Sequence, residues 1–75
     1  MTFPMQTVDS SNIEAVGYDA DSFTLRVKFL SGNTYEYLDV PAELYDALMN
    51  APSKGAFLGK RIKGQFEHIN LGRIG

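Results

Sequence analysis

Hydrophobic and polar residues alternate strictly in one segment of the chain, residues 23–29. A period of two with aromatic and β-branched residues is typical of a half-buried β-strand. The alternation stops at Ser31-Gly32-Asn33 and resumes over residues 34–38, so the sequence predicts a β-hairpin. Residues 13–18 (IEAVGY) predict a first short strand before it. The apolar positions of the central strand are Phe23, Leu25, Val27 and Phe29.

From Pro41 onward the hydrophobic period becomes that of an amphipathic helix, which continues to residue 51. Pro41 suits the first helical position because its missing N–H group needs no partner there. Pro52 ends this helix, and Ser53 is a suitable N-cap for a second helix that Gly64 terminates. The apolar positions of the two helices are Leu44, Tyr45, Leu48, Ala51, Phe57, Leu58 and Ile62.

The order of these elements predicts an α+β domain. We expect a small three-stranded antiparallel sheet, connected as a meander, followed by two helices that pack on one face of it. This domain covers residues 13–66 in our interpretation. Residues 1–12, which are polar and contain Pro4, are expected to be a flexible lead-in, and residues 67–75 a C-terminal tail. A further short strand in residues 65–75, at Phe66, His68 or Ile69, is the less favoured alternative for this tail.

The size of the chain limits its function. With 75 residues it supports one small core, and such a domain buries only about 60% of the surface that its unfolded chain exposes. A catalytic cleft would remove apolar contacts from this core, so we expect a binding surface and no enzyme. Residues 1–6 lack the pattern of a secretory signal, and no apolar run approaches the roughly 20 residues of a membrane-spanning helix. A cytoplasmic domain with no membrane contact, monomeric by default, is expected.

The motifs that would hold a cofactor or a metal are incomplete. Residues 55–61 resemble a phosphate loop, but the glycines are too close together and Arg61 follows the lysine. Residues 19–30 begin like a calcium loop but place Phe23 at a ligand position. The chain has no cysteine, and His68 is its only histidine. The sequence therefore predicts no cofactor, no metal and no catalytic residue.

Charge is distributed unevenly along the chain. The net charge of −2 counts against binding nucleic acid by bulk charge. Residues 1–51, however, carry two basic and eight acidic residues, and residues 52–75 carry five basic and one acidic residue. A basic C-terminal third is able to contact phosphates, although we slightly favour an intramolecular explanation, in which these charges complement the helix dipole and balance the acidic first helix. The basic residues of this third are Lys54, Lys60, Arg61, Lys63 and Arg73.

Arg61 differs from its basic neighbours in its place on the helical wheel. It falls between Phe57 and Leu58, inside the apolar stripe, whereas Lys60 and Lys63 face away from that stripe. An arginine in this position either directs its guanidinium outward along the edge of the core or pairs with a carboxylate. We favour a structural ion pair over a ligand contact.

The register of the hairpin decides the role of Tyr35 and Tyr37. With a three-residue loop, Ser31–Asn33, Tyr35 faces Phe29, both tyrosines join the core, and Lys28 faces Glu36. With a two-residue loop the tyrosines share a face with Arg26 and Lys28, which would make a stacking platform for single-stranded nucleic acid. The first register separates polar from apolar residues more cleanly and pairs opposite charges, so we favour it.

A set of motifs follows in order along the chain over roughly residues 8–66. They are VDSSNI with GYD, TLxVxF with Gly32, YxYxxVP, and the residues Tyr45, Leu48, Ala51, Ser53, Gly55, Phe57 and Ile62. Together they resemble the KTSC domain, a short module known at the C-terminus of some lysyl-tRNA synthetases and as a free-standing small protein. The resemblance implies RNA binding as a suggested function, without catalytic residues.

These observations favour a non-enzymatic binding module. Our first hypothesis is that it binds RNA through Lys60, Lys63 and Arg61, with Lys54 and the tyrosines Tyr35 and Tyr37 as further candidates. The alternative is a protein-interaction module that uses a sheet edge or the apolar residues Leu38 and Met49.

Overall fold

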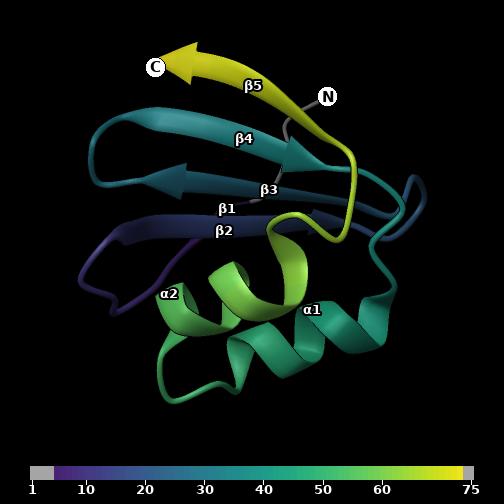
Figure 1. The fold of residues 1–75 in the computed structure, drawn as a ribbon, viewed down its shortest axis with the longest axis horizontal. Helices are drawn as coiled ribbons and strands as arrows, with labels where there is room; N and C mark the ends of the chain where they lie inside the picture. Colours follow the sequence, from purple (N-terminus) through teal and green to yellow (C-terminus); the bar gives the residue numbers. More distant parts are fainter. Residues whose placement is uncertain (1–4, 74–75) are drawn as a thin grey trace.

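The structure, a computed structural model, describes residues 5–73. Their strands form one antiparallel sheet in the order β1-β2-β3-β4-β5 (Figure 1). Two helical segments lie between β4 and β5 in the sequence: α1, and α2 together with the turn η1 that continues it. The α+β class and the two helices are confirmed, whereas the prediction of three strands is wrong, because the sheet has five. The elements are β1 (Met5–Thr7), β2 (Ile13–Asp19), β3 (Thr24–Phe29), β4 (Asn33–Tyr37), α1 (Ala42–Met49), α2 (Lys54–Phe57), η1 (Leu58–Ile62) and β5 (His68–Arg73).

The two additional strands are the edges of the sheet. β1 pairs with β2 and lies in the predicted lead-in, while β5 pairs with β4 and lies in the predicted tail. All three residues of β1 and most of β5 are exposed. Neither segment therefore needs the alternation of apolar and polar residues from which the inner strands were predicted.

The β3–β4 hairpin has a three-residue loop, but the loop begins one residue earlier than predicted. Leu30–Gly32 connects the strands, and Gly32 has a positive φ of 100°, which favours glycine. Val27 faces Tyr35 and Arg26 faces Glu36, so the register differs by two residues from the predicted one. A shift of two keeps each side chain on its face. Both tyrosines thus lie on the face of Val27, as predicted.

The charged pairs on the opposite face change with this register. Arg26 Nη2 lies 2.6 Å from Glu36 Oε2, and Lys28 Nζ lies 3.3 Å from Glu14 Oε2. The predicted pair of Lys28 and Glu36 is wrong, because the earlier loop places Thr34 opposite Lys28. These two ion pairs connect three neighbouring strands on the face that carries no helix.

The helices follow the predicted signals closely. α1 begins one residue after Pro41, which is its N-cap. Ser53 is confirmed as the N-cap of α2, since its Oγ accepts a hydrogen bond from the N–H of Ala56 at 3.3 Å. A π-helical turn, η1, continues α2 and closes with a 2.7 Å hydrogen bond from Lys63 N to Leu58 O.

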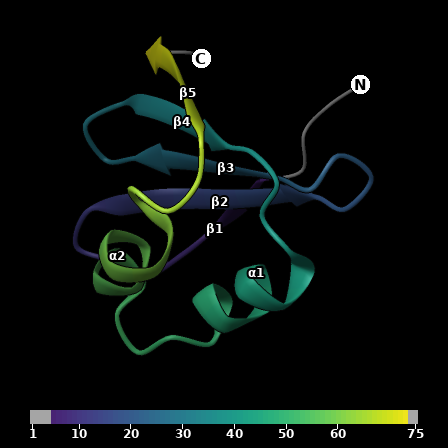
Figure 2. The same ribbon diagram turned by 45° about the vertical axis from the view of Figure 1, so that its right-hand side comes forward.

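The core lies between the helices and one face of strands β2, β3 and β4. Figures 1 and 2 show both helical segments on the β2 side of the sheet and β5 as the strand furthest from α1. The helices therefore leave the β4–β5 end of this face uncovered. The fully buried members of the core are Ile13, Val16, Leu25, Val27, Tyr37, Val40, Leu48, Leu58 and Ile62.

Candidate functional site

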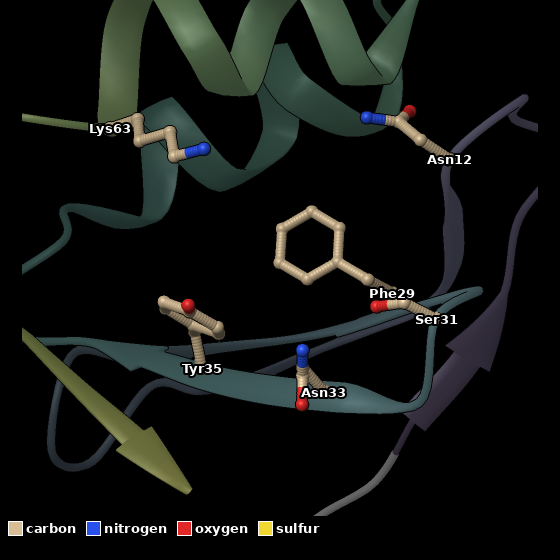
Figure 3. A pocket seen from close by; sticks show the side chains of 6 residues that line it. All are labelled: Asn12, Phe29, Ser31, Asn33, Tyr35 and Lys63. Atoms are coloured by element: carbon tan, nitrogen blue, oxygen red, sulfur yellow. The ribbon is translucent and has the colours of Figure 1, made fainter. Parts of the chain in front are cut away.

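An open hollow of about 250 Å³ lies at the end of the sheet face that the helices leave uncovered. Four segments contribute to it: the residue before β2, the end of β3 with the following loop, the first half of β4, and the residue after η1. Figure 3 shows its side chains from close by. The lining residues are Asn12, Phe29, Ser31, Asn33, Tyr35 and Lys63.

Two aromatic rings form the apolar part of the hollow. The rings of Phe29 and Tyr35 meet edge to face, with centroids 5.7 Å apart and an interplanar angle of 87°. The other side of Tyr35 is supported by His68, whose ring is stacked at 5.7 Å. Both Phe29 and Tyr35 are half-buried and pack against the core. The hollow therefore has a rigid aromatic floor that solvent reaches.

Polar side chains border the aromatic floor. Figure 3 shows the side-chain nitrogens of Asn12 and Lys63 directed into the space above Phe29 and Tyr35, and that of Asn33 directed toward Phe29 from the side of β4. Lys63 follows the π-helical turn with an extended backbone, φ −63° and ψ 124°, so it is no longer part of the helix. The hollow thus combines aromatic surface with hydrogen-bond donors and one positive charge.

The predicted basic residues do not form one cluster. Lys63 lines the hollow, whereas Arg61 lines a second, shallow depression with Pro41, Glu43, Leu44 and Ala47. Lys60 is exposed, and Lys54 Nζ donates to the carbonyl of Ala51 at 3.4 Å.

Arg61 makes no ion pair with any residue in the range 5–73. Its guanidinium instead lies over the ring of Phe57, 5.7 Å from the centroid, and the residue is exposed. The predicted structural ion pair is therefore wrong. The reason is that residues 58–62 form a π-helical turn, whereas the predicted position of Arg61 assumed 100° per residue throughout.

The two predicted tyrosines occupy different environments. Tyr37 is 1% exposed and belongs to the core, so it offers no surface for stacking. Burial raises the pKa of the Tyr37 hydroxyl above its usual value, and the neighbouring Tyr35 raises it further. Tyr35, two residues earlier on the same face, is the tyrosine that reaches the hollow.

Another tyrosine connects the sheet to α1. The ring of Tyr18 stacks on that of Tyr45 at 4.9 Å, and its hydroxyl donates to the carbonyl oxygen of Val40. Burial raises the pKa of the Tyr18 hydroxyl, with Asp19 and Asp46 adding to the effect. Tyr18 thus has a structural role at the far end of the core.

The residues proposed for protein binding are less exposed than expected. Leu38 and Met49 are both half-buried, and Met49 packs against the core. Other large apolar side chains of the described part of the chain are exposed: Met5, Phe23, Leu30 and Ile69.

Sequence reasoning did not find the polar residues of the hollow. Asn12, Ser31 and Asn33 are turn residues on the edges of strands, and turns favour these residue types whatever their function. One signal in the sequence could have indicated part of the site. A hairpin loop with an odd number of residues places Phe29, Asn33 and Tyr35 on the same face of the sheet.

The chain was compared with known proteins. The model of the KTSC domain matches residues 9–66. A lysine–tRNA ligase of Nostoc is 42% identical over 71 residues, which are 95% of this chain but 13% of the ligase. A protein of Tsukamurella paurometabola is 43% identical over 67 residues, 89% of this chain and 100% of that protein.

The fold also resembles a solved structure. The crystal structure of a KTSC domain protein from Yersinia pestis is 39% identical and similar with a TM-score of 0.90, covering 95% of this chain and 100% of that one. Within residues 5–73, no helix is long and apolar enough to cross a membrane.

Proposed function

The chain belongs to the KTSC domain family, and we propose that it is a non-enzymatic module that binds single-stranded RNA at the hollow between β3, β4 and the end of η1. Lys63, with Lys60 and Arg61 nearby in the sequence, contacts phosphates, and Tyr35 with Phe29 contacts an unstacked base. We further propose that it acts in the cytoplasm.

The observation that carries this proposal is the position of Lys63 beside the aromatic floor. Lys63 and Tyr35 line the same hollow, although they are 28 positions apart in the sequence. Proteins that bind single strands combine positive charge along the backbone with aromatic rings on which bases stack. The hollow unites these two groups at a scale that suits one nucleotide.

The pairing of charges supports the same proposal. The two basic residues of β3, Arg26 and Lys28, are held in ion pairs with Glu36 and Glu14. Within the described residues, Lys60, Arg61 and Lys63 form no such pair. Their charges are therefore not neutralised by the acidic first helix, and they are available to an anionic ligand.

The relatives give the proposal a biological context. The Nostoc relative is a ligase named for lysine and tRNA, and this chain spans 13% of its length. The matching segment there belongs to a protein whose name includes an RNA substrate. The similar protein of Tsukamurella paurometabola consists of this domain alone, so the domain does not require the rest of the ligase. A contact with RNA by the domain itself is consistent with both settings.

A salt titration tests the proposal. We expect a labelled single-stranded RNA of about eight nucleotides to bind with an affinity that falls as salt rises from about 50 to 200 mM, with a log–log slope of about −2 for three phosphate contacts. Lys63→Glu should weaken binding strongly. Lys28→Glu is a matched control, because it changes charge equally on the opposite face. Undetectable binding at low salt would contradict the proposal.

One observation favours a second candidate function. β5 is an edge strand whose outer side has no partner among the described strands, and Ile69 on it is 45% exposed. Such an edge can accept a strand from another protein. A protein partner bound at this edge should be retained by the double variant Lys60→Glu with Lys63→Glu and lost by Ile69→Lys. RNA should show the opposite pattern.

A further inference from the structure

The side-chain nitrogens around the hollow have no hydrogen-bond partners among residues 5–73. None of the side-chain nitrogens of Asn12, Asn33 and Lys63 donates a hydrogen bond to another residue in the range 5–73, although other groups of the same loops do. Figure 3 shows those of Asn12 and Lys63 directed into the hollow and that of Asn33 directed toward Phe29. Its rim therefore offers hydrogen-bond donors to a ligand that lies on the aromatic floor.

The orientation of the Asn12 amide is fixed by its surroundings. Ser10 Oγ accepts hydrogen bonds from the N–H groups of Asn12 and Ile13, at 3.4 and 3.3 Å, and donates its own proton to Asn12 Oδ1 at 3.1 Å. Turning the amide over would lose the hydrogen bond from Ser10 and place Nδ2 against a hydroxyl oxygen that already accepts two hydrogen bonds. The amide oxygen is thus occupied, and the Nδ2 group is the end that faces the hollow.

Gly55 on α2 lies directly against the same amide. A Cβ atom at position 55 would lie 2.3 Å from Asn12 Oδ1, so the Asn12 side chain would have to move aside. Glycine at this position leaves room for the amide where it lies. The hydrogen bond from Ser10 therefore holds the amide beside Gly55, and this preorganisation lowers the entropy cost of binding through the amide.

We propose that the hollow selects an unpaired base that presents carbonyl oxygens, with uracil preferred over adenine. This inference rests on the proposed RNA-binding function and assigns it a base preference. The base stacks on Tyr35 and meets the ring of Phe29, which stands at 87° to that of Tyr35, edge-on. Asn12 Nδ2 and Asn33 Nδ2 donate to its carbonyl oxygens, and Lys63 Nζ contacts the adjoining phosphate.

The chemistry of the bases explains this preference. Uracil carries two carbonyl oxygens, whereas adenine carries none and presents an amino group that donates hydrogen bonds. With adenine in the hollow, a ring nitrogen can accept from one of the two amide donors, but the adjacent amino group faces the second donor, which loses its hydration without compensation. Cytosine keeps one carbonyl oxygen and should lie between the two.

Affinities for homopolymeric RNA test this preference. Fluorescence anisotropy should show oligouridine of about eight nucleotides binding about five- to tenfold more tightly than oligoadenosine of equal length, with oligocytidine between them. Equal affinities for oligouridine and oligoadenosine would overturn the base preference and leave the proposed function intact. Absence of binding by every oligonucleotide at low salt would overturn both.

The variant Gly55→Ala tests the role of Asn12 without touching the floor or the charge. It should displace the Asn12 amide and abolish the preference for oligouridine, while the affinity for oligoadenosine stays within about twofold. Gly59→Ala is the matched control, since nothing lies within 4 Å of a Cβ atom at position 59. If Gly55→Ala does not fold by circular dichroism, Asn12→Ala replaces it. A preference unchanged in the folded variant would overturn the inference.

Discussion

Tyr35 and Tyr37 lie two residues apart on one strand and on the same face of the sheet, yet they have different environments. Tyr37 is 1% exposed beneath the helices, whereas Tyr35 is half-buried and reaches the hollow. Because both residues belong to β4, the difference lies along the strand: Tyr35 is nearer the β3–β4 loop, where the hollow opens, and Tyr37 is the last residue of the strand. Figure 2 shows the helices below the sheet on its β2 side. One continuous aromatic face is thus divided into a core and a candidate binding site.

The largest expected effect is on stability and separates the two tyrosines. Tyr37→Ala should lower the free energy of unfolding by about 3–5 kcal/mol, because it removes a large buried ring from the core. Tyr35→Ala should cost less than about 1.5 kcal/mol, since its ring is already half in solvent. Urea unfolding followed by circular dichroism measures both. Equal losses would show that the two rings do not differ as described.

The second effect reverses the comparison. Tyr35→Ala should weaken RNA binding by about 1–3 kcal/mol, because a base loses its stacking surface. Tyr35→Phe should retain most of the affinity, since the ring remains. Tyr37→Phe is the control in the core and should leave binding unchanged. Fluorescence anisotropy at low salt gives the affinities, and a loss of binding in Tyr37→Phe that matches Tyr35→Ala would contradict the division of the face.

A smaller effect concerns the charge beside the hollow. Lys63→Gln should reduce the magnitude of the log–log salt slope by about 0.7, the contribution of one phosphate contact on a single strand. Lys54→Gln should change the slope less, because Lys54 donates to the carbonyl of Ala51 and does not line the hollow. Salt titrations of both variants measure this difference. Identical slopes for Lys63→Gln and the unmodified protein would remove Lys63 from the site.

The smallest expected effect is a pH dependence of stability that arises from the ionisation of Tyr37. The pKa of Tyr37 is raised above its usual 10.0 by burial, so the unfolded chain ionises first as the pH rises. The stability that Tyr37 contributes is therefore fully present below about pH 10 and is lost above it. Urea midpoints measured from about pH 9 to pH 11 should fall less steeply for Tyr37→Phe than for the unmodified protein. Parallel curves would contradict this account.

The inner part of the fold was predictable from the sequence because its elements are amphipathic. Alternation indicated the three central strands, and the proline and serine signals indicated both helices. The edge strands could not be predicted in this way: β1 has three exposed residues, and β5 exposes most of its side chains. Such strands are formed by backbone pairing with a neighbour, which leaves little trace in hydrophobic pattern.

The candidate site was predictable only in part. Lys63 and Tyr35 were among the predicted residues. The side of the sheet on which Tyr35 lies was predicted correctly, because the hairpin loop has an odd number of residues. The predicted pairing register of the hairpin was wrong, since a glycine at position 32 permits a loop that starts at Leu30 or at Ser31. Asn12 and Gly55 meet across 43 positions of sequence, and only the tertiary structure brings them together.

The central claim is that the uncovered end of the sheet binds RNA while the covered end is only core. Chemical-shift mapping by NMR tests it most directly, with oligouridine added to the isotope-labelled protein. The account predicts that the largest changes lie at Asn12, Phe29, Tyr35 and Lys63, with little change at Lys28 on the opposite face. Changes centred on Arg26 and Lys28, or confined to β5, would contradict it.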